Sequence, residues 1–381
     1  MEKYTERKLV LKDGKTFIGK GFGSLEDKVM EIVFNTSMVG YQEIISDPSY
    51  TDQGVVMTYP LIGNYGINDD DFETETPTIS GFIVRDYNDE PSNCRSTKTL
   101  SEVMQDYGIV GLFDIDTREL ARHIRDIGSC LGIITDVFTT TEAALKKIEN
   151  YVVPHDAVNR VSPKEKYDFV YDLSKELIPE RASAGKKNHE VFHVVAIDCG
   201  MKKNILRMFV KYGCKVTVVP WNTTSEEIMA LKPDGIFVSN GPADPTDVTE
   251  TIKSIRELKG KCPIFGICLG HQIISLAYGA KTYKLKFGHR GGNHPVKNYL
   301  TDKIEITSQN HSYAVDLNSI DGTGLEVTHI NLLDNTVEGM RCVKDMVLSV
   351  QYHPESAPGP QDSSYLFDDF IAMMKSRKEA R

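Results

Sequence analysis

The sequence predicts an α/β protein whose C-terminal part is a doubly wound, mostly parallel sheet with a nucleophile elbow, preceded by a smaller domain of mixed α/β character. Two observations predict the C-terminal part. From His193 onward, short apolar runs alternate with segments of helical period, which is typical of parallel strands covered by helices on both faces. Within this part, a strand runs into a cysteine flanked by glycines and then into a helix. Residues 7–150 lack this alternation, which indicates a separate unit.

Composition excludes several classes of protein. The 381 residues suggest two or three domains, and a formal net charge of −10 argues against a nucleic-acid-binding protein. No apolar run is long enough for a membrane span, and the charged N-terminus lacks the apolar core of a secretory signal. The seven cysteines show no CxxC spacing, which favours a reducing compartment. We therefore expect a cytoplasmic protein.

The first domain, residues 1–150, is expected to begin with a hairpin. Two strands flank the turn Asp13-Gly14, and Asp116 or Thr117 is positioned to cap a later helix. The expected elements are strands 8–12, 16–19 and 31–35 and helices 99–107 and 117–126. Residues 151–190 are polar and rich in turn formers, so we expect a connector there.

The second domain, residues 191–381, carries the alternating pattern. Its expected strands are 194–198, 215–221, 235–240, 263–267 and 347–351, and its expected helices are 201–212, 224–231, 247–259 and 269–278. Ligands of such sheets bind beyond the carboxyl ends of the strands. Gly241, Cys268 and His353 each follow a strand end, so we expect them at one edge of the sheet.

Cys268 is the candidate nucleophile. It follows the apolar run 263–267, has Gly266 and Gly270 close on either side, and precedes a helix. Such an elbow lifts the side chain off the sheet edge and directs the next backbone N–H groups at the group that is attacked. Taken alone, the same pattern also fits a buried cysteine in a glycine-rich turn.

The tetrapeptide that follows the last strand supplies a base. His353 offers an imidazole, Glu355 can hydrogen-bond its far nitrogen, and Pro354 restricts the backbone between them. A cysteine nucleophile requires a base that holds it as a thiolate. The start of the helix at Leu269 adds only about 0.3–1 kcal/mol for an adjacent anion, so His353 is expected to be the main activator.

These motifs resemble a known family. The runs GICLGHQ and HPE are similar to those of the class I (triad) glutamine amidotransferases. The segments VFNTSMVGYQEIISDPSY, YPLIGNYG, DIDTREL, NILR, GIFVSNGP, FGHRGGNHPV, SQNHSYAVD and HPESAPGP resemble the small, glutamine-hydrolysing subunit of carbamoyl-phosphate synthetase, across nearly the whole chain. The resemblance implies a triad of Cys268, His353 and Glu355 that forms a γ-glutamyl thioester and releases ammonia.

The resemblance also implies a glutamine site and an oxyanion hole. The elbow offers the N–H of Leu269, and Gly241 is the candidate for the second donor, although residues 239–242 alone would fit an ordinary turn. The implied glutamine contacts are Ser49, Gly241, Ala243, Leu269, Gln272, Asn310, Ser312 and Tyr313. The family patterns GPGDP and NHGF read GPADP and NHSY here. Ala243 and Ser312 can serve if their φ angles are negative and would be strained otherwise.

No metal or cofactor is expected in this chain. His289 and His294 lack a further ligand at suitable spacing, and Asp114 and Asp116 precede a helix and fit a cap. Neither a complete phosphate loop nor a GxGxxG motif is present. The resemblance therefore implies a large partner subunit that binds ATP and Mg²⁺, receives ammonia through a channel, and makes carbamoyl phosphate from bicarbonate for arginine and pyrimidine synthesis. The expected assembly is a heterodimer, with residues 1–150 as the docking domain.

Three alternatives remain at this point. One is the amidotransferase component of anthranilate or GMP synthesis, which the N-terminal 150 residues disfavour. Another is a non-catalytic regulatory or scaffold subunit, which the intact Cys268, His353 and Glu355 disfavour. The third is a free-standing γ-glutamyl hydrolase, which an assay for an ammonia acceptor would distinguish.

Overall fold

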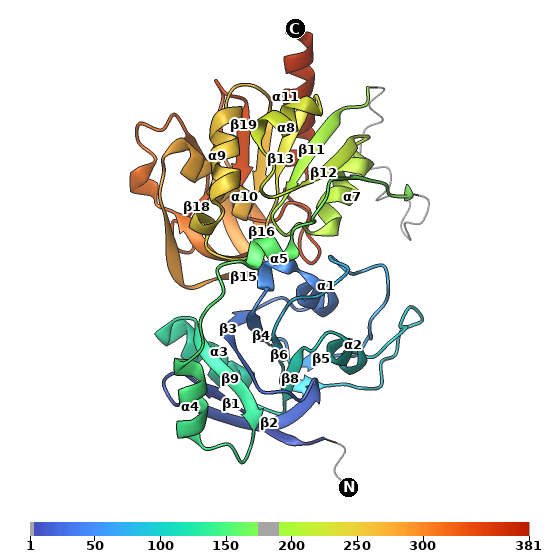
Figure 1. Cartoon of the computed structure of the whole chain (residues 1–381), viewed down its shortest axis with the longest axis vertical. Coiled ribbons are helices and arrows are strands. Elements are labelled where there is room, and N and C mark those ends of the chain that lie inside the picture. Colours follow the sequence, from blue (N-terminus) through green and yellow to red (C-terminus); the bar gives the residue numbers. More distant parts are fainter. Residues whose placement is uncertain (1–3, 174–189, 381) are drawn as a thin grey trace. The chain divides into compact units, whose positions relative to one another are not determined.

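The computed structural model describes residues 4–173 and 190–380 (Figure 1). The chain forms two compact units. The first comprises residues 1–154 together with 286–291, and the second comprises residues 155–285 together with 292–381. The structure therefore agrees with the predicted fold class, a mixed N-terminal unit followed by an α/β unit.

A closed barrel is the framework of the N-terminal unit. Its strands are β1 (Glu6–Leu11), β2 (Thr16–Gly23), β8 (Val110–Phe113), β6 (Gly81–Ile83), β4 (Gln53–Met57), β3 (Lys28–Asn35) and β9 (Cys130–Asp136), in that order around the barrel. The first two strands form the expected antiparallel hairpin, and Gly14 in its turn has a φ of 87°. Apolar side chains such as Leu9, Met30 and Ile32 pack into one buried cluster of this unit.

Helices and short elements surround the barrel strands. They are α1 (Tyr41–Ser46), the 3-10 turn η1 (Pro48–Tyr50), β5 (Leu61–Ile62), β7 (Asp86–Tyr87), α2 (Leu100–Asp106), α3 (Thr117–Ile127) and α4 (Thr141–Glu149). Asp116, rather than Thr117, is the N-cap of α3 and accepts a hydrogen bond from the backbone N–H of Glu119. The Asp114–Asp116 pair thus precedes a helix and supplies its cap.

A mixed sheet is the framework of the C-terminal unit. Its parallel part runs in the order β12 (Lys215–Pro220), β11 (His193–Asp198), β13 (Gly235–Val238), β14 (Ile264–Ile267) and β19 (Val347–Val350). The strand β10 (Tyr167–Phe169) joins the β12 edge in the antiparallel direction. On the other side the sheet continues through β18 (Val337–Cys342), β17 (Glu326–Asn331), β15 (Thr282–Asn298) and β16 (Lys303–Val315). The sequence pattern does not predict this second part, in which β17 pairs antiparallel with both β15 and β18.

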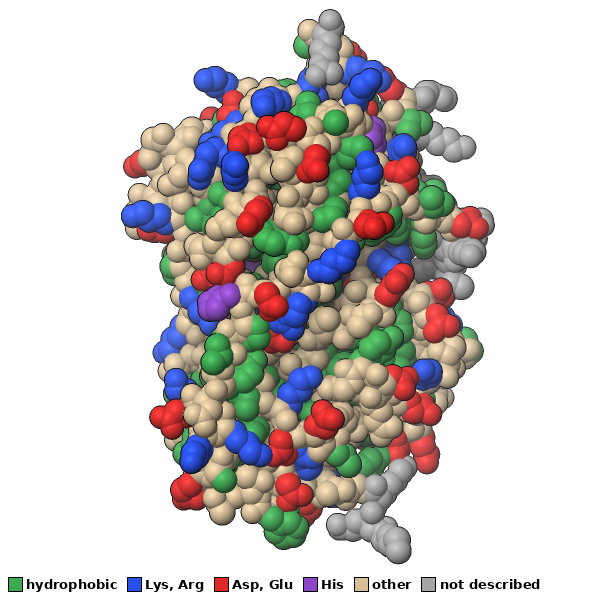
Figure 2. Space-filling view, viewed as in Figure 1, with side chains coloured by type: hydrophobic (Ala, Val, Ile, Leu, Met, Phe, Trp, Pro, Cys, Tyr) green, Lys and Arg blue, Asp and Glu red, His purple; other side chains and the backbone are tan. Residues whose placement is uncertain are grey.

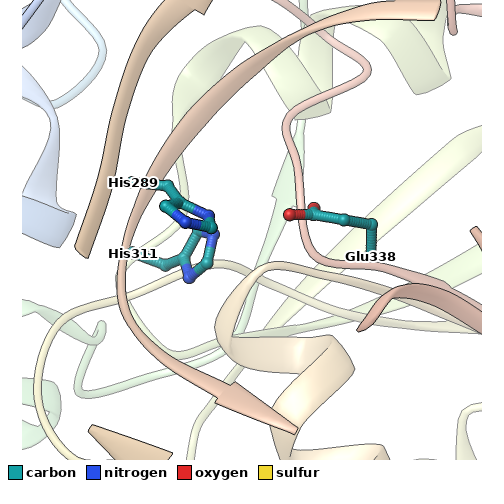
Figure 3. Close-up of side chains that lie close together, drawn as sticks. All are labelled: His289, His311 and Glu338. Carbon is teal, nitrogen blue, oxygen red and sulfur yellow. The ribbon is translucent and has the colours of Figure 1, made fainter. Parts of the chain in front are cut away.

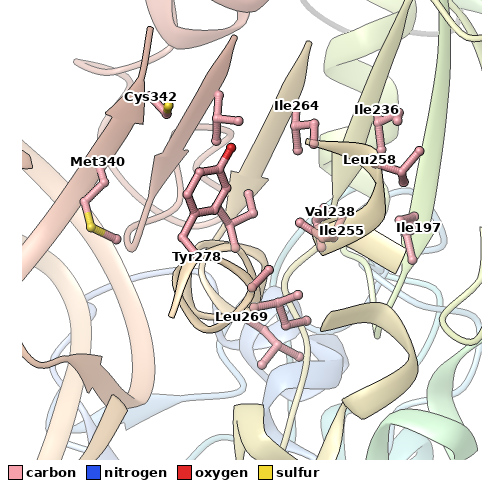
Figure 4. Close-up of a cluster of buried hydrophobic side chains, with 14 of the residues drawn as sticks. Ile197, Ile236, Val238, Ile255, Leu258, Ile264, Leu269, Tyr278, Met340 and Cys342 are labelled. Atoms are coloured by element: carbon pink, nitrogen blue, oxygen red, sulfur yellow. The ribbon is translucent and has the colours of Figure 1, made fainter. Parts of the chain in front are cut away.

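Alternating residues of the parallel strands bury both faces of the sheet. Val195 and Ile197 belong to a cluster that also contains residues of α8 (Ser225–Ala230), α9 (Thr249–Leu258) and α10 (Leu269–Tyr278). Val194 and Ala196 belong to the opposite cluster, which contains residues of α7 (Lys203–Lys211) and α11 (Tyr365–Glu379). Figure 4 shows part of the first cluster, including Ile197, Ile236, Ile264 and Leu258. Helices on both faces make this a doubly wound sheet.

The expected connector, residues 151–190, differs in part from the structure. Its α5 (Ala157–Val161) and β10 belong to the C-terminal unit, which begins at His155. The hydroxyl of Ser162 accepts a hydrogen bond from the N–H of Trp221 at 3.0 Å, and β10 pairs with β12. Hydrogen bonds to an edge strand therefore order a segment whose composition resembles a loop. Residues 174–189 of the expected connector lie outside the described residues.

Charged side chains of both signs are interspersed on the face drawn in Figure 2. The formal net charge of the whole chain is −10. Within residues 4–173 and 190–380, no helix has the length and apolar character that crossing a membrane requires.

Candidate active site

Cys268 lies at the sharp turn between β14 and α10. Its φ of 54° and ψ of −105° are unusual for a residue with a side chain, and such strained conformations typically cost about 1–3 kcal/mol. The turn is held by a hydrogen bond of 2.9 Å from the N–H of Cys268 to the carbonyl of Val350 on the neighbouring strand. The thiol is buried, with 2 % of the residue exposed. The strained strand–turn–helix arrangement has the geometry expected of a nucleophile elbow.

The glycine after the thiol is required by packing. A Cβ atom on Gly270 would lie 2.1 Å from the carbonyl oxygen of Val238, a distance that no side chain can adopt without a shift of backbone. The absent side chain lets the first turn of α10 pack directly against β13. This close approach places Cys268 at the carboxyl end of the parallel strands, where ligands of such sheets bind.

His353 and Glu355 form a buried pair just beyond the end of β19. The Nδ1 atom of His353 lies 2.7 Å from Oε1 of Glu355, and the N–H of His353 donates to the carbonyl of Ser308 at 2.9 Å. Because a carboxylate only accepts, Nδ1 carries the proton. The other ring nitrogen, Nε2, is buried and makes no hydrogen bond within the described residues, and the thiol of Cys268 is near enough to raise the pKa of this imidazole.

The charges of this pair are mutually stabilised. Burial acts to lower the pKa of His353, but the charge of Glu355, the nearby thiol of Cys268 and the hydrogen bond to Glu355 outweigh it and raise the pKa to about 10. Burial acts to raise the pKa of Glu355, but Lys202 and His353 outweigh it and lower the pKa to about 2. Near neutral pH the pair is therefore an imidazolium and a carboxylate.

Lys202 is a charged residue of the site that the sequence analysis missed. Its Nζ atom lies 2.9 Å from Oε1 of Glu355 and 2.6 Å from the carbonyl oxygen of Ser356, and its side chain is 3 % exposed. The backbone N–H of Lys202 donates to Oδ1 of Asn240 at 3.1 Å. In the sequence, Lys202 lies four residues after the expected strand 194–198 and inside the expected helix 201–212, so its position alone did not indicate a role in the site.

Two backbone N–H groups are available as oxyanion donors. Leu269 is the first residue of α10, where helix N–H groups have no intrahelical acceptor. The N–H of Gly241 donates no hydrogen bond to the described residues. A Cβ atom on Gly241 would lie 2.1 Å from the carbonyl oxygen of Cys199 and 2.9 Å from Cδ2 of Leu269, so the glycine brings the two loops together.

Several of the predicted glutamine contacts lie together around the thiol. The Sγ atom of Cys268 is 3.5 Å from the carbonyl oxygen of Asn310. The Nε2 atom of Gln272 donates to the carbonyl of Tyr313 at 2.8 Å and to Oε1 of Gln351 at 2.9 Å. Cys268, Gln272, Asn310 and Tyr313 are thus linked directly or through neighbours on one strand, β16. Ser312 lies between Asn310 and Tyr313 on the same strand.

Ser49 belongs to the N-terminal unit. It lies in η1, and its backbone N–H donates to Oδ1 of Asp47 at 2.8 Å. Its part in glutamine binding stays a prediction from the resemblance.

The expected condition of a negative φ is not met at Ala243, so the backbone there is strained. Its φ is 81°, in the left-handed region that favours glycine. Ser312 and Tyr313 are not among the described non-glycine residues with positive φ. The loop after β13 thus has a backbone conformation that glycine adopts easily, but in this chain the residue at that position is alanine.

Replacing Ala243 with glycine is expected to raise the free energy of unfolding by up to about 1 kcal/mol. The substitution relieves the strain of a left-handed residue, which is roughly 1–2 kcal/mol. The greater conformational entropy of glycine in the unfolded chain offsets about 0.4–1 kcal/mol of this gain in stability. The control is Ala372→Gly on the exposed side of α11, which should lower stability by roughly 0.5–1 kcal/mol. Urea denaturation measures the free energy of unfolding of both variants, which should change in opposite directions. An equal loss of stability in the two variants would contradict the strain at Ala243.

Comparison with known proteins defines first the class of the C-terminal unit. The family model described as "Glutamine amidotransferase class-I" matches residues 195–373, which contain the elbow, His353 and Glu355. The model described as "Carbamoyl-phosphate synthase small chain, CPSase domain" matches residues 9–134.

Relatives along the whole chain define the particular family. A "Carbamoyl phosphate synthase small chain" from Fusobacterium nucleatum is 50% identical over 365 residues, which are 96% of this chain and 97% of the relative. Proteins of the same name from Syntrophotalea carbinolica and Bacillus caldolyticus are also 50% identical, over 98% and 97% of this chain and 99% and 97% of their own length. The chain belongs to the carbamoyl phosphate synthase small-chain family and carries a class I glutamine amidotransferase domain.

Proposed function

We propose that this chain hydrolyses glutamine and supplies the ammonia to a large synthetase subunit. The Sγ atom of Cys268 attacks the side-chain amide carbon of glutamine. The C–N bond breaks, and ammonia leaves with a proton donated by the imidazolium of His353. A γ-glutamyl thioester remains on Cys268. Water, deprotonated by His353, then breaks the thioester and releases glutamate.

The observation that carries this proposal is the buried line of charges behind the thiol. Lys202 contacts Glu355 at 2.9 Å, Glu355 contacts Nδ1 of His353 at 2.7 Å, and Nε2 of His353 is the nitrogen left for Cys268. A buried ion pair is a weak source of stability, because desolvation offsets the attraction of the charges. A pair that orients an imidazole beside a strained cysteine is better explained by proton transfer at that thiol.

The N–H groups of Gly241 and Leu269 form the proposed oxyanion hole. Each would donate to the oxygen that becomes negative when Sγ adds to the amide. The proposed contacts for the rest of the glutamine molecule are those that the resemblance implies, namely Ser49, Ala243, Gln272, Asn310, Ser312 and Tyr313.

The proposed fate of ammonia rests on the family and on motifs missing from the sequence. Without a phosphate loop, the chain has no apparent means of phosphorylating bicarbonate, so we assign ATP and Mg²⁺ to the large subunit. The N-terminal unit is the proposed docking domain, and the proposed assembly is a heterodimer that channels ammonia and serves arginine and pyrimidine synthesis. All seven cysteines are free, which supports the proposed cytoplasmic location.

Coupling to the large subunit provides the test of this function. The isolated chain should release glutamate slowly, and addition of the large subunit with ATP and bicarbonate should accelerate release by about 5- to 150-fold, the usual range of allosteric coupling. Glutamate release is measured with each component omitted in turn. Fast hydrolysis by the isolated chain, unchanged by the large subunit, would instead favour a free-standing γ-glutamyl hydrolase. No hydrolysis in the complete mixture would contradict the glutaminase itself.

A further inference from the structure

A line of buried hydrogen bonds connects two strands behind residues 310–313. The Nε2 atom of Gln309 donates to Oε2 of Glu338 at 2.9 Å, and Oε1 of Gln309 lies 2.9 Å from Nε2 of His311. The other ring nitrogen of His311, Nδ1, lies 2.7 Å from the carbonyl oxygen of Tyr313. Figure 3 shows the carboxylate of Glu338 pointing toward the imidazole of His311. The line therefore runs from β18 to the backbone of β16.

The members of this line are removed from solvent. Gln309 is 1 % exposed, Glu338 is 0 % exposed and His311 is 5 % exposed. Glu338 also accepts a hydrogen bond from Nδ2 of Asn331 at 3.0 Å. A buried carboxylate is costly unless donors surround it, and a partly satisfied polar network is less stable than an apolar core. The loss of any one donor should therefore disturb the whole line.

The hydrogen-bonding partners determine which atoms of Gln309 and His311 carry protons. A carboxylate only accepts, so the amide nitrogen of Gln309 must face Glu338 and its oxygen must face His311. The oxygen of Gln309 and the carbonyl of Tyr313 both accept, so His311 donates from both ring nitrogens and is an imidazolium. Glu338 supplies the balancing charge, because ligand atoms of His311 and Glu338 lie within 4.8 Å of each other.

The line ends at the segment beside the thiol. The carbonyl of Tyr313 that accepts from His311 also accepts from Nε2 of Gln272 on α10 at 2.8 Å. Three residues earlier, the carbonyl of Asn310 accepts from the thiol of Cys268 at 3.5 Å. A shift of this strand segment would therefore move groups that lie next to the nucleophile.

We propose that Gln309 and Glu338 are positioning residues, which hold His311 as an imidazolium and so fix residues 310–313 in the shape that binds glutamine. This inference rests on the proposed function, because that function assigns Asn310, Ser312 and Tyr313 to glutamine. Neither residue touches the substrate in this account. Both act through His311 on the backbone.

An exchange of the two side chains tests the proposal in the full chain with its large subunit. Glu338→Gln removes the charge, and Gln309→Glu places two carboxylates together. Each should raise the KM for glutamine by roughly 10- to 100-fold, the range for losing a hydrogen bond to a charged group, with a much smaller change in kcat. The double variant Gln309→Glu/Glu338→Gln restores one amide and one carboxylate and should recover most of the loss. Glu326→Gln on β17 is the control, because that carboxylate is exposed and pairs with Arg341.

A second measurement separates this inference from the proposed function. Amide hydrogen exchange at residues 310–313 needs no activity, and it should be faster in Glu338→Gln than in Glu326→Gln and the wild type. Unchanged exchange and unchanged KM in a folded Glu338→Gln variant would overturn the inference. A double variant whose KM for glutamine is no lower than those of the two single variants would also overturn the inference. If the wild-type chain failed to hydrolyse glutamine, the proposed function would fall, while the exchange result would still decide whether the line holds the strand.

Discussion

Replacing Cys268 with serine is expected to abolish glutamine-dependent synthesis of carbamoyl phosphate while ammonia-dependent synthesis by the complex survives. A hydroxyl is a far weaker nucleophile than a thiolate, and the loss of a triad nucleophile typically costs roughly 10⁴-fold or more. The free energy of unfolding should change little, because the oxygen occupies nearly the same space at the buried elbow. The substitution therefore separates the chemistry of the thiol from the fold.

The two reactions are measured on the same preparation, with glutamine or with an ammonium salt as the nitrogen source. Cys94→Ser is the matched control, because this cysteine is exposed and lies in the N-terminal unit. It should leave both activities at the wild-type level. Loss of the ammonia-dependent reaction in Cys268→Ser would show a damaged assembly, and retention of the glutamine-dependent reaction would contradict Cys268 as the nucleophile.

His353→Asn is expected to slow thioester formation more than Glu355→Gln does. The imidazole transfers the proton, which typically contributes 10²–10⁴-fold, whereas the carboxylate holds the ring and its charge. Glu355→Gln should have the larger effect on stability. It leaves Lys202 buried with a neutral partner at 2.9 Å, and breaking a buried pair typically costs about 3–5 kcal/mol.

Single-turnover mixing with glutamine measures thioester formation, and urea denaturation of the same variants measures stability. We expect His353→Asn to have the lower rate of thioester formation and Glu355→Gln to have the lower free energy of unfolding. Small and equal rate losses in both variants would contradict the roles assigned to the two residues.

The parts of the site that could be predicted are those written in local sequence. Cys268 stands between a strand and a helix with glycines nearby, and His353 and Glu355 are two residues apart, so short-range rules were sufficient. Lys202 and Glu338 could not be selected in the same way. Their partners are distant in sequence, because Lys202 and Glu355 are 153 positions apart and Gln309 and Glu338 are 29 positions apart. Only the folded sheet brings them together.

The fold also has parts that the local sequence predicts and parts that it does not. The alternation of strands and helices after His193 predicted the parallel half of the sheet, because each unit buries its own apolar face. The closure of the N-terminal barrel depends on pairing between β1 and β9, which lie more than a hundred residues apart. The antiparallel half also depends on the long strands β15 and β16, which are too irregular in polarity to show a strand period. The strain at Ala243 depends on a backbone angle that composition does not specify.

Labelling with an electrophilic glutamine analogue, followed by mass spectrometry of the peptides, tests whether Cys268 is the nucleophile. We expect one covalent adduct, on Cys268, whose formation is slowed by added glutamine and is greatly reduced in His353→Asn. Burial raises the pKa of the Cys199 thiol, so that residue should stay unmodified, and the exposed Cys94 should react only with a reagent that lacks the glutamine group. An adduct on Cys94 or Cys199 that glutamine prevents, with Cys268 unmodified, would contradict Cys268 as the site of glutamine hydrolysis.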